Sequence, residues 1–172
     1  MAWTESSVNG YTVLEETGLT ISDNEGGDTE YVTVSSVIDT GLYPGWEGAK
    51  FPVMVEVTTA GGGAGVMDAF LQTSTQSLAT GDTFGGSSVT PLWADATSAQ
   101  DLTATCLVNA TTKNTGQIDA SSVKAPYARI ALKVASTTDI ANSNGRCTIT
   151  VAIPGAKATK LAAVAGIGAD PS

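Results

Sequence analysis

Short stretches of alternating apolar and polar or small residues are the feature of this sequence that most restricts its fold. Residues 51–57, 129–134 and 147–153 each alternate in this way. Because side chains two positions apart share one face of a strand, each stretch predicts a strand with one face in a core. Burial of one apolar side chain contributes about 1.5–3 kcal/mol, so roughly a dozen per face would hold two sheets together. The pattern therefore predicts an antiparallel, two-sheet β-sandwich.

The composition also favours the all-β class. Only 15% of the 172 residues are charged, whereas solvated helices need Glu, Lys and Arg on their outer faces. Hydrophobic residues make up 42% of the chain, which is enough for a packed core. The length fits one domain that is stable without disulfides or metals. We therefore expect a single all-β domain.

The sequence divides into three parts. Residues 1–30 include the acidic, Gly-rich run 22–28 and are expected to form an N-terminal arm or loop. Residues 31–153 hold the predicted strands and are expected to form the β-sandwich domain. Residues 154–172 are rich in Ala and Gly, and we expect a C-terminal tail that is extended or partly disordered and becomes ordered on a neighbour. A short helix is the alternative there, and it is disfavoured by Gly155, Gly166 and Gly168.

A Gly-rich turn at 61–65 joins the predicted strand 51–57 to the apolar run 66–72. Two β-forming runs with a Gly-rich connection predict an antiparallel pair of neighbouring strands. Residues 73–86 and 109–122 are mostly small and polar and are expected to be loops.

The charge of the chain excludes several classes of partner. Eight Lys and Arg residues stand against seventeen Asp and Glu residues, which gives a net charge of −9. Binding to phosphate groups relies on Lys and Arg, so we expect no nucleic-acid partner. No apolar run approaches the roughly 20 residues that cross a bilayer, so we expect no membrane role. The first residues lack the basic and apolar regions of a secretory signal, which predicts synthesis in the cytoplasm.

The complete lack of His argues against catalysis. It removes the commonest general base and the usual activator of a Ser or Cys nucleophile. A pair of carboxylates could still cleave glycosides, and the candidates would be Asp68, Asp95 and Asp101. Only 6% of the residues are aromatic, however, which is few for a sugar-binding enzyme. We expect these acids to lie in turns or on the surface, and we predict no catalytic residue and no enzyme activity.

The sequence also predicts neither a metal site nor a cofactor site. Cys106 and Cys147 are far apart and have no His beside them, so they are expected to be buried, reduced thiols, with a disulfide as the alternative. The acidic run that begins at Asp23 resembles a calcium loop, but Gly27 and Val34 stand where ligands are required. The Gly-rich turn at 61–65 lacks the Lys and hydroxyl residues of a phosphate loop.

Four segments of the sequence form a recognisable set: the Ile-Asp-x-Gly turn in 36–41, the alternating strand 51–57, the Leu-Gln-Thr-Ser segment in 70–75, and 127–132. Together they resemble the jelly-roll capsid cement (head decoration) proteins of tailed phages. The resemblance extends over residues 31–153. It implies a jelly roll that forms a homo-oligomer (dimer or trimer) and bridges subunits of the major capsid protein on the outer surface of the virion head. The first thirty residues and the Ala/Gly tail depart from the family pattern.

Two other functions stay open at the level of the sequence. The first is a non-catalytic binding module, such as the sugar- or receptor-binding sandwich of a phage fibre, and the second is a carboxylate hydrolase. The tryptophans bear on this choice, because exposed aromatic residues serve either as anchors for a partner or as sugar platforms. The alternative for each is that it caps the core from a loop. The tryptophans are Trp3, Trp46 and Trp93.

Overall fold

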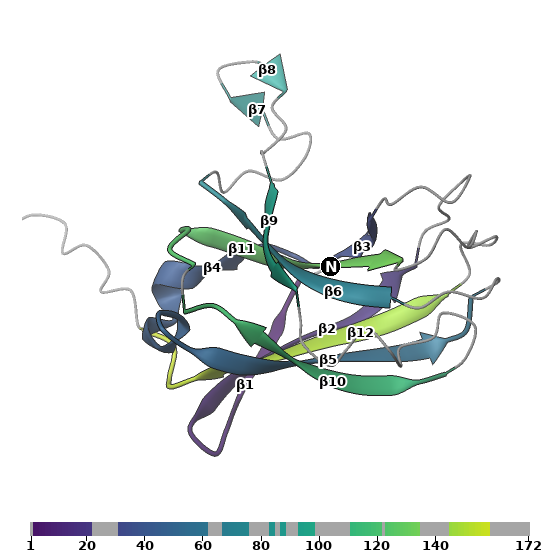
Figure 1. Ribbon diagram of the computed structural model, residues 1–172, viewed down its shortest axis with the longest axis horizontal. Coiled ribbons are helices and arrows are strands. Elements are labelled where there is room, and N and C mark those ends of the chain that lie inside the picture. The colour runs from purple at the N-terminus through teal and green to yellow at the C-terminus, as the bar shows by residue number, and fades with distance from the viewer. Residues whose placement is uncertain are drawn as a thin grey trace, which may run out of the picture.

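The chain folds into two antiparallel sheets that pack face to face (Figure 1). The computed structural model describes residues 2–21, 31–61, 67–75, 83–84, 87–88, 93–98, 111–121, 123–134 and 145–158. Strands account for most of these residues, and the only helical elements among them are two single 3-10 turns. The predicted all-β sandwich is therefore confirmed.

Sheet A, the lower sheet in Figure 1, has the strand order β1-β2-β12-β5-β10. Its strands are β1 (Thr4–Val8), β2 (Tyr11–Thr20), β12 (Arg146–Pro154), β5 (Lys50–Thr59) and β10 (Lys113–Asp119).

Sheet B lies above sheet A and has the order β3-β11-β6-β9, with β4 paired to β11. Its strands are β3 (Tyr31–Val34), β11 (Tyr127–Val134), β6 (Met67–Ser74), β9 (Ala94–Ser98) and β4 (Ile38–Asp39). The remaining elements are η1 (Thr40–Leu42), η2 (Pro44–Trp46) and the small pair β7 (Thr83–Phe84) and β8 (Ser87–Ser88).

The core lies between the two sheets, and the alternating segments supply it as predicted. In β5 the odd-numbered residues from Phe51 to Val57 are at most 1% exposed. In β11, Ile130 and Leu132 are fully buried and point to the same core. Pairing of β12 with β5 brings Ile149 opposite Val55. The period-two pattern therefore identified these strands correctly.

The predicted pairing of β5 with β6 is wrong. β5 lies in sheet A between β12 and β10, and β6 lies in sheet B between β11 and β9. The Gly-rich connection between them thus links the two layers. A flexible turn of this kind fits a crossing between layers as well as a hairpin, so its composition did not decide the pairing.

The first twenty residues differ from the expected arm or loop. Residues 4–8 and 11–20 form a hairpin, and β2 pairs with β12 along most of its length. Asn9 and Gly10 have φ angles of 48° and 82°, the positive values that a two-residue type I′ turn requires. Leu14 is buried in the core, so β2 is an integral strand of the sandwich.

β10 also departs from the sequence prediction, because it is a strand within a segment expected to be a loop. Its outer positions are polar, yet Gly116 and Ile118 face the core. Asp101, Cys106, the run 23–28 and the tail beyond residue 158 lie outside the described residues. Within the part of the chain that is described, no helix is long and apolar enough to cross a bilayer.

Candidate functional site

Three of the four motif segments named in the sequence analysis (36–41, 70–75 and 127–132) lie side by side at one end of sheet B. Tyr127 of β11 is in register with Asp39 of β4 on one side and with Ser74 of β6 on the other. Ala128, the next residue, pairs in the same way with Ile38 and Thr73. The motifs are separated by tens of residues in the sequence, and the sheet brings them together.

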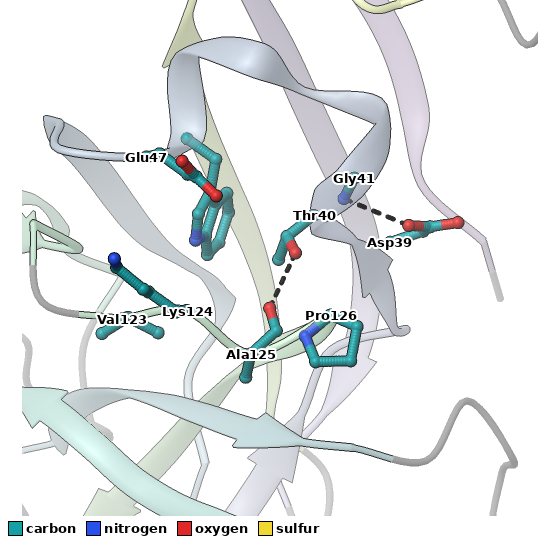
Figure 2. A pocket seen from close by; sticks show the side chains of 9 residues that line it. Asp39, Thr40, Gly41, Glu47, Val123, Lys124, Ala125 and Pro126 are labelled. Atoms are coloured by element: carbon teal, nitrogen blue, oxygen red, sulfur yellow. Dashed lines mark hydrogen bonds between the residues drawn. The ribbon is translucent and has the colours of Figure 1, made fainter.

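The Ile-Asp-x-Gly turn is tied to the segment that leads into β11. The Asp39 carboxylate accepts a hydrogen bond from the Gly41 backbone N–H at 3.2 Å, which caps η1. The Thr40 hydroxyl donates to the Ala125 carbonyl at 2.7 Å, and the Thr40 backbone N–H donates to the Pro126 carbonyl at 3.0 Å. Figure 2 shows the two side-chain bonds. The turn is therefore fixed in position by its own cap and by hydrogen bonds to residues 125 and 126.

A pocket of about 250 Å³ lies beneath this turn (Figure 2). This volume is below the roughly 300–1,000 Å³ of typical small-molecule sites. Charged groups of both signs surround it, with Glu47 and Lys124 on one side and Asp39 on the other. The pocket is lined by Asp39, Thr40, Gly41, Trp46, Glu47, Val123, Lys124, Ala125 and Pro126.

Trp46 forms part of the pocket wall and also belongs to the core. It is 1% exposed, and its ring centroid lies 4.9 Å from that of Phe51. Its indole Nε1 is buried without a hydrogen-bond partner. An unsatisfied buried donor costs about 1–3 kcal/mol, so the packing of the ring offsets this cost. Trp46 thus caps the core, one of the two roles considered for it.

Three side chains from distant parts of the chain meet at Tyr43, the residue between η1 and η2. The Lys157 ammonium forms an ion pair with Glu5 at 2.7 Å and lies 5.8 Å from the centre of the Tyr43 ring. The Tyr43 hydroxyl contacts the same carboxylate at 3.4 Å. The backbone N–H of Ala158 donates to the carbonyl of Leu42 at 2.7 Å, which fixes residues 155–158 against η1.

This cluster shifts two pKa values upward. Burial raises the pKa of the Tyr43 hydroxyl above its ordinary value of 10.0, and the nearby Glu5 charge raises it further. The hydrogen bond with Glu5 raises the pKa of the Lys157 ammonium above 10.5. Both raised values mean that the folded chain holds these protons more tightly than the unfolded chain does.

We therefore predict a loss of stability in alkaline solution. The contribution of Tyr43 and Lys157 is fully present below their unfolded pKa values and is lost as the pH rises through the higher folded values. Lys157→Gln should flatten the fall in the free energy of unfolding above about pH 10. Urea unfolding of this variant and of the unchanged chain at a series of pH values measures this slope. A slope equal to that of the unchanged chain would contradict the assignment to Lys157.

The other two tryptophans have defined contacts. Trp3 packs partly buried against the core, and its Nε1 donates to the Ser36 carbonyl at 3.0 Å. Trp93 lies under the guanidinium of Arg129, whose Cζ is 4.3 Å from the ring centroid. Arg129 also donates from Nε to the Gln72 carboxamide at 2.8 Å. Sequence patterns did not predict the Trp93–Arg129 contact, because the two residues lie far apart in the chain.

Of the three candidate acids, the structure places two on adjacent strands of sheet B. Asp95 of β9 is in register with Gln72, four residues along β6 from Asp68. Asp101 lies outside the described residues. Cys147 is buried in β12, as predicted, whereas Cys106, with which a disulfide was the alternative, lies outside the described residues. No group of three potential metal ligands occurs within the described ranges.

Comparison with known proteins assigns no family. No protein-family model matches the sequence, and a search among curated proteins finds no significant match.

Proposed function

We propose that this chain is a capsid cement protein with a jelly-roll fold. It would bind the outer surface of an icosahedral phage head as a homo-oligomer and stabilise the head by bridging subunits of the major capsid protein. In this role it carries out no catalysis and needs no metal or cofactor. The observation that carries the proposal is the convergence of three motif segments at one end of sheet B.

The order of the strands supports a jelly roll. Apart from the added β1 and β4, four strands in each sheet follow the orders β2-β12-β5-β10 and β3-β11-β6-β9. Along the chain, β2 lies in sheet A, β3 in sheet B, β5 in sheet A and β6 in sheet B. β9 is the neighbour of β6 within sheet B, and β10, β11 and β12 then lie in sheets A, B and A. Two interlocked Greek keys of eight strands give this arrangement.

The chemistry of the pocket end suits a protein contact. The Asp39 turn is held by three hydrogen bonds, so little conformational freedom is lost when a partner binds. The charged residues around the pocket are of both signs, and the chain contains no His. These residues therefore suit a protein contact through complementary shape better than acid–base chemistry. An oligomer that touches several capsid subunits gains about 10²–10⁴ in avidity over a single contact.

The proposal is tested with heads of the virus that encodes the chain, assembled without it. We expect the purified protein to sediment with expanded heads in a saturable way and to raise their disruption temperature. Ala125→Leu, which fills the pocket, should weaken binding. Ala60→Leu is the matched control, because Ala60 is exposed beyond the far end of β5. Heads that bind none of the protein, or that are equally stable with and without it, would refute the proposal.

A sugar- or receptor-binding module is the alternative, and the tryptophans give it less support. Trp46 is buried in the core, and the ring of Trp93 is covered on one face by Arg129. A glycan array and a calcium titration by calorimetry test it directly. Specific sugar or calcium binding, together with failure to bind heads, would replace the cement role.

A further inference from the structure

β1 is an edge strand whose side chains are all exposed. It is the outermost strand of sheet A, and each of its five side chains is accessible to solvent. It contains no Lys, no Pro and no bulge, which are the usual features that prevent an edge from pairing with another chain. The opposite edge, β10, carries Lys113 and Asp119 in ion pairs with β5. β1 is therefore the less protected edge of this sheet.

β1 is also held in a fixed position. The Trp3 indole donates to the Ser36 carbonyl at 3.0 Å, and Glu5 is paired with Lys157 at 2.7 Å. The backbone N–H of Gly155 donates to the carbonyl of Gly10 at 2.8 Å, which anchors the hairpin turn. Figure 1 shows this turn projecting below the rest of sheet A. A strand fixed in this way loses little conformational freedom on pairing.

The register of the hairpin shows which backbone groups face the free edge. Val8 and Tyr11 flank the two-residue turn and so form a hydrogen-bonded pair, and such pairs alternate along an antiparallel ladder. Ser6, paired with Val13, is therefore also bonded to β2. The N–H and C=O groups of Glu5 and Ser7 point away from β2. A partner strand would bind through these two residues.

The sequence of β1 is compatible with a second copy of itself. An antiparallel pair with its twofold axis at Ser6 places Glu5 of each copy opposite Ser7 of the other, so no like charges are opposed. The outward-facing backbone groups of both residues are then satisfied. Val8, which is 51% exposed, would lie opposite Thr4 of the second copy.

We propose that two copies of the chain pair through β1 about a twofold axis at Ser6, joining their A sheets into one continuous sheet. Closed twofold dimers are the commonest symmetric assemblies. This contact specifies the homo-oligomer of the proposed function, but it forms in solution without a head. Dimerisation and head binding can therefore fail independently.

A cysteine at the axis tests the geometry. Ser6 would face Ser6 in a non-hydrogen-bonded pair with Cα atoms about 4.5 Å apart, a distance that a disulfide spans. Ser6→Cys should give a covalent dimer of twice 17.3 kDa under mild oxidation. Thr115→Cys, exposed on the β10 edge, should stay monomeric on a denaturing gel, and the unchanged chain gives the background from its native thiols.

Proline at Ser7 tests the same contact without oxidation. The Ser7 N–H points to the free edge, so Ser7→Pro removes a donor to the second copy and none to β2. Light scattering should show a dimer for the unchanged chain and a monomer for Ser7→Pro, with the same circular dichroism spectrum. A monomeric unchanged chain at high concentration, a dimeric Ser7→Pro, or no cross-link through Cys at position 6 would overturn the proposal. The cross-linking result decides if Ser7→Pro does not fold.

Discussion

Replacement of Gly45 by alanine is expected to destabilise the fold by about 3 kcal/mol or more, at the upper end for an overpacked site. Gly45 lies in η2, and a Cβ atom built there would overlap the backbone carbonyl oxygen of Pro154 at the end of β12. Backbone cannot rotate away as a flexible side chain can. The methyl group must therefore push η2 away from β12. This shift would also move Trp46, the next residue along the chain, which is buried in the core.

Gly41→Ala is the matched control. Its Cβ would lie 3.3 Å from the Asp39 carboxylate oxygen, a side-chain atom that can shift slightly. Thermal unfolding followed by tryptophan fluorescence measures Tm for both variants. At about 2–4 °C per kcal/mol for a chain of this size, Gly45→Ala should lower Tm by at least ~6 °C. Equal losses in the two variants would show that the close approach of Gly45 to Pro154 is not limiting.

The second large effect is expected at Glu16, a buried carboxylate between the two sheets. Glu16 is 2% exposed on the core face of β2. One carboxylate oxygen accepts the Ser36 backbone N–H at 2.7 Å, and the other accepts the Ser36 hydroxyl at 2.8 Å. Ser36 belongs to the segment between β3 and β4 of sheet B. The Glu16 side chain therefore links β2 of sheet A to the segment between β3 and β4 of sheet B.

Glu16→Ala should cost about 3–5 kcal/mol, because each hydrogen bond to a charged group contributes about 1.5–3 kcal/mol and the donors would lose their acceptor inside the protein. Glu16→Gln retains one acceptor and should cost less. Glu15→Ala, at the exposed neighbouring position, should change stability by less than about 0.5 kcal/mol.

Chemical denaturation of Glu16→Ala, Ser36→Ala and the double variant measures the coupling between the two residues. Ser36→Ala removes only the hydroxyl donor, because the backbone N–H of residue 36 still donates to Glu16. We expect the two losses to be non-additive by the contribution of the hydroxyl bond. Additive losses would mean that this hydroxyl–carboxylate bond does not stabilise the fold.

The sequence predicted some strands well and others poorly, for physical reasons. β5, β11 and β12 contribute one regular apolar face to the core, so the period of two is visible in their residues. β1 has no buried side chain, and β10 is mostly polar, so neither shows an apolar alternation. The hairpin did carry a local signal in Asn9-Gly10, which favours a tight turn between strands. The segments on either side of this turn show no regular alternation of apolar and polar residues, so the turn signal alone did not identify the two strands.

The candidate site was less predictable than the strands. The Asp39 turn was noted through the resemblance, but the pocket beneath it needs residues 123–126 from a segment some eighty positions later. Glu16 resembles any other surface acid in the sequence. Its burial depends on Ser36, twenty residues away, and no local pattern reports that contact.

Residue types and their local spacing determined the secondary structure class, the apolar faces of three strands and the lack of any His-dependent chemistry. The tertiary structure alone decided that β5 and β6 belong to different sheets, that β2 lies inside sheet A, and that the Asp39 turn lies beside β11. The physical reason is the distance along the chain over which each property is set. The alternation of side chains is set by each strand's own backbone, whereas many pairings of similar strands satisfy that alternation, and only packing of the whole core selects among them.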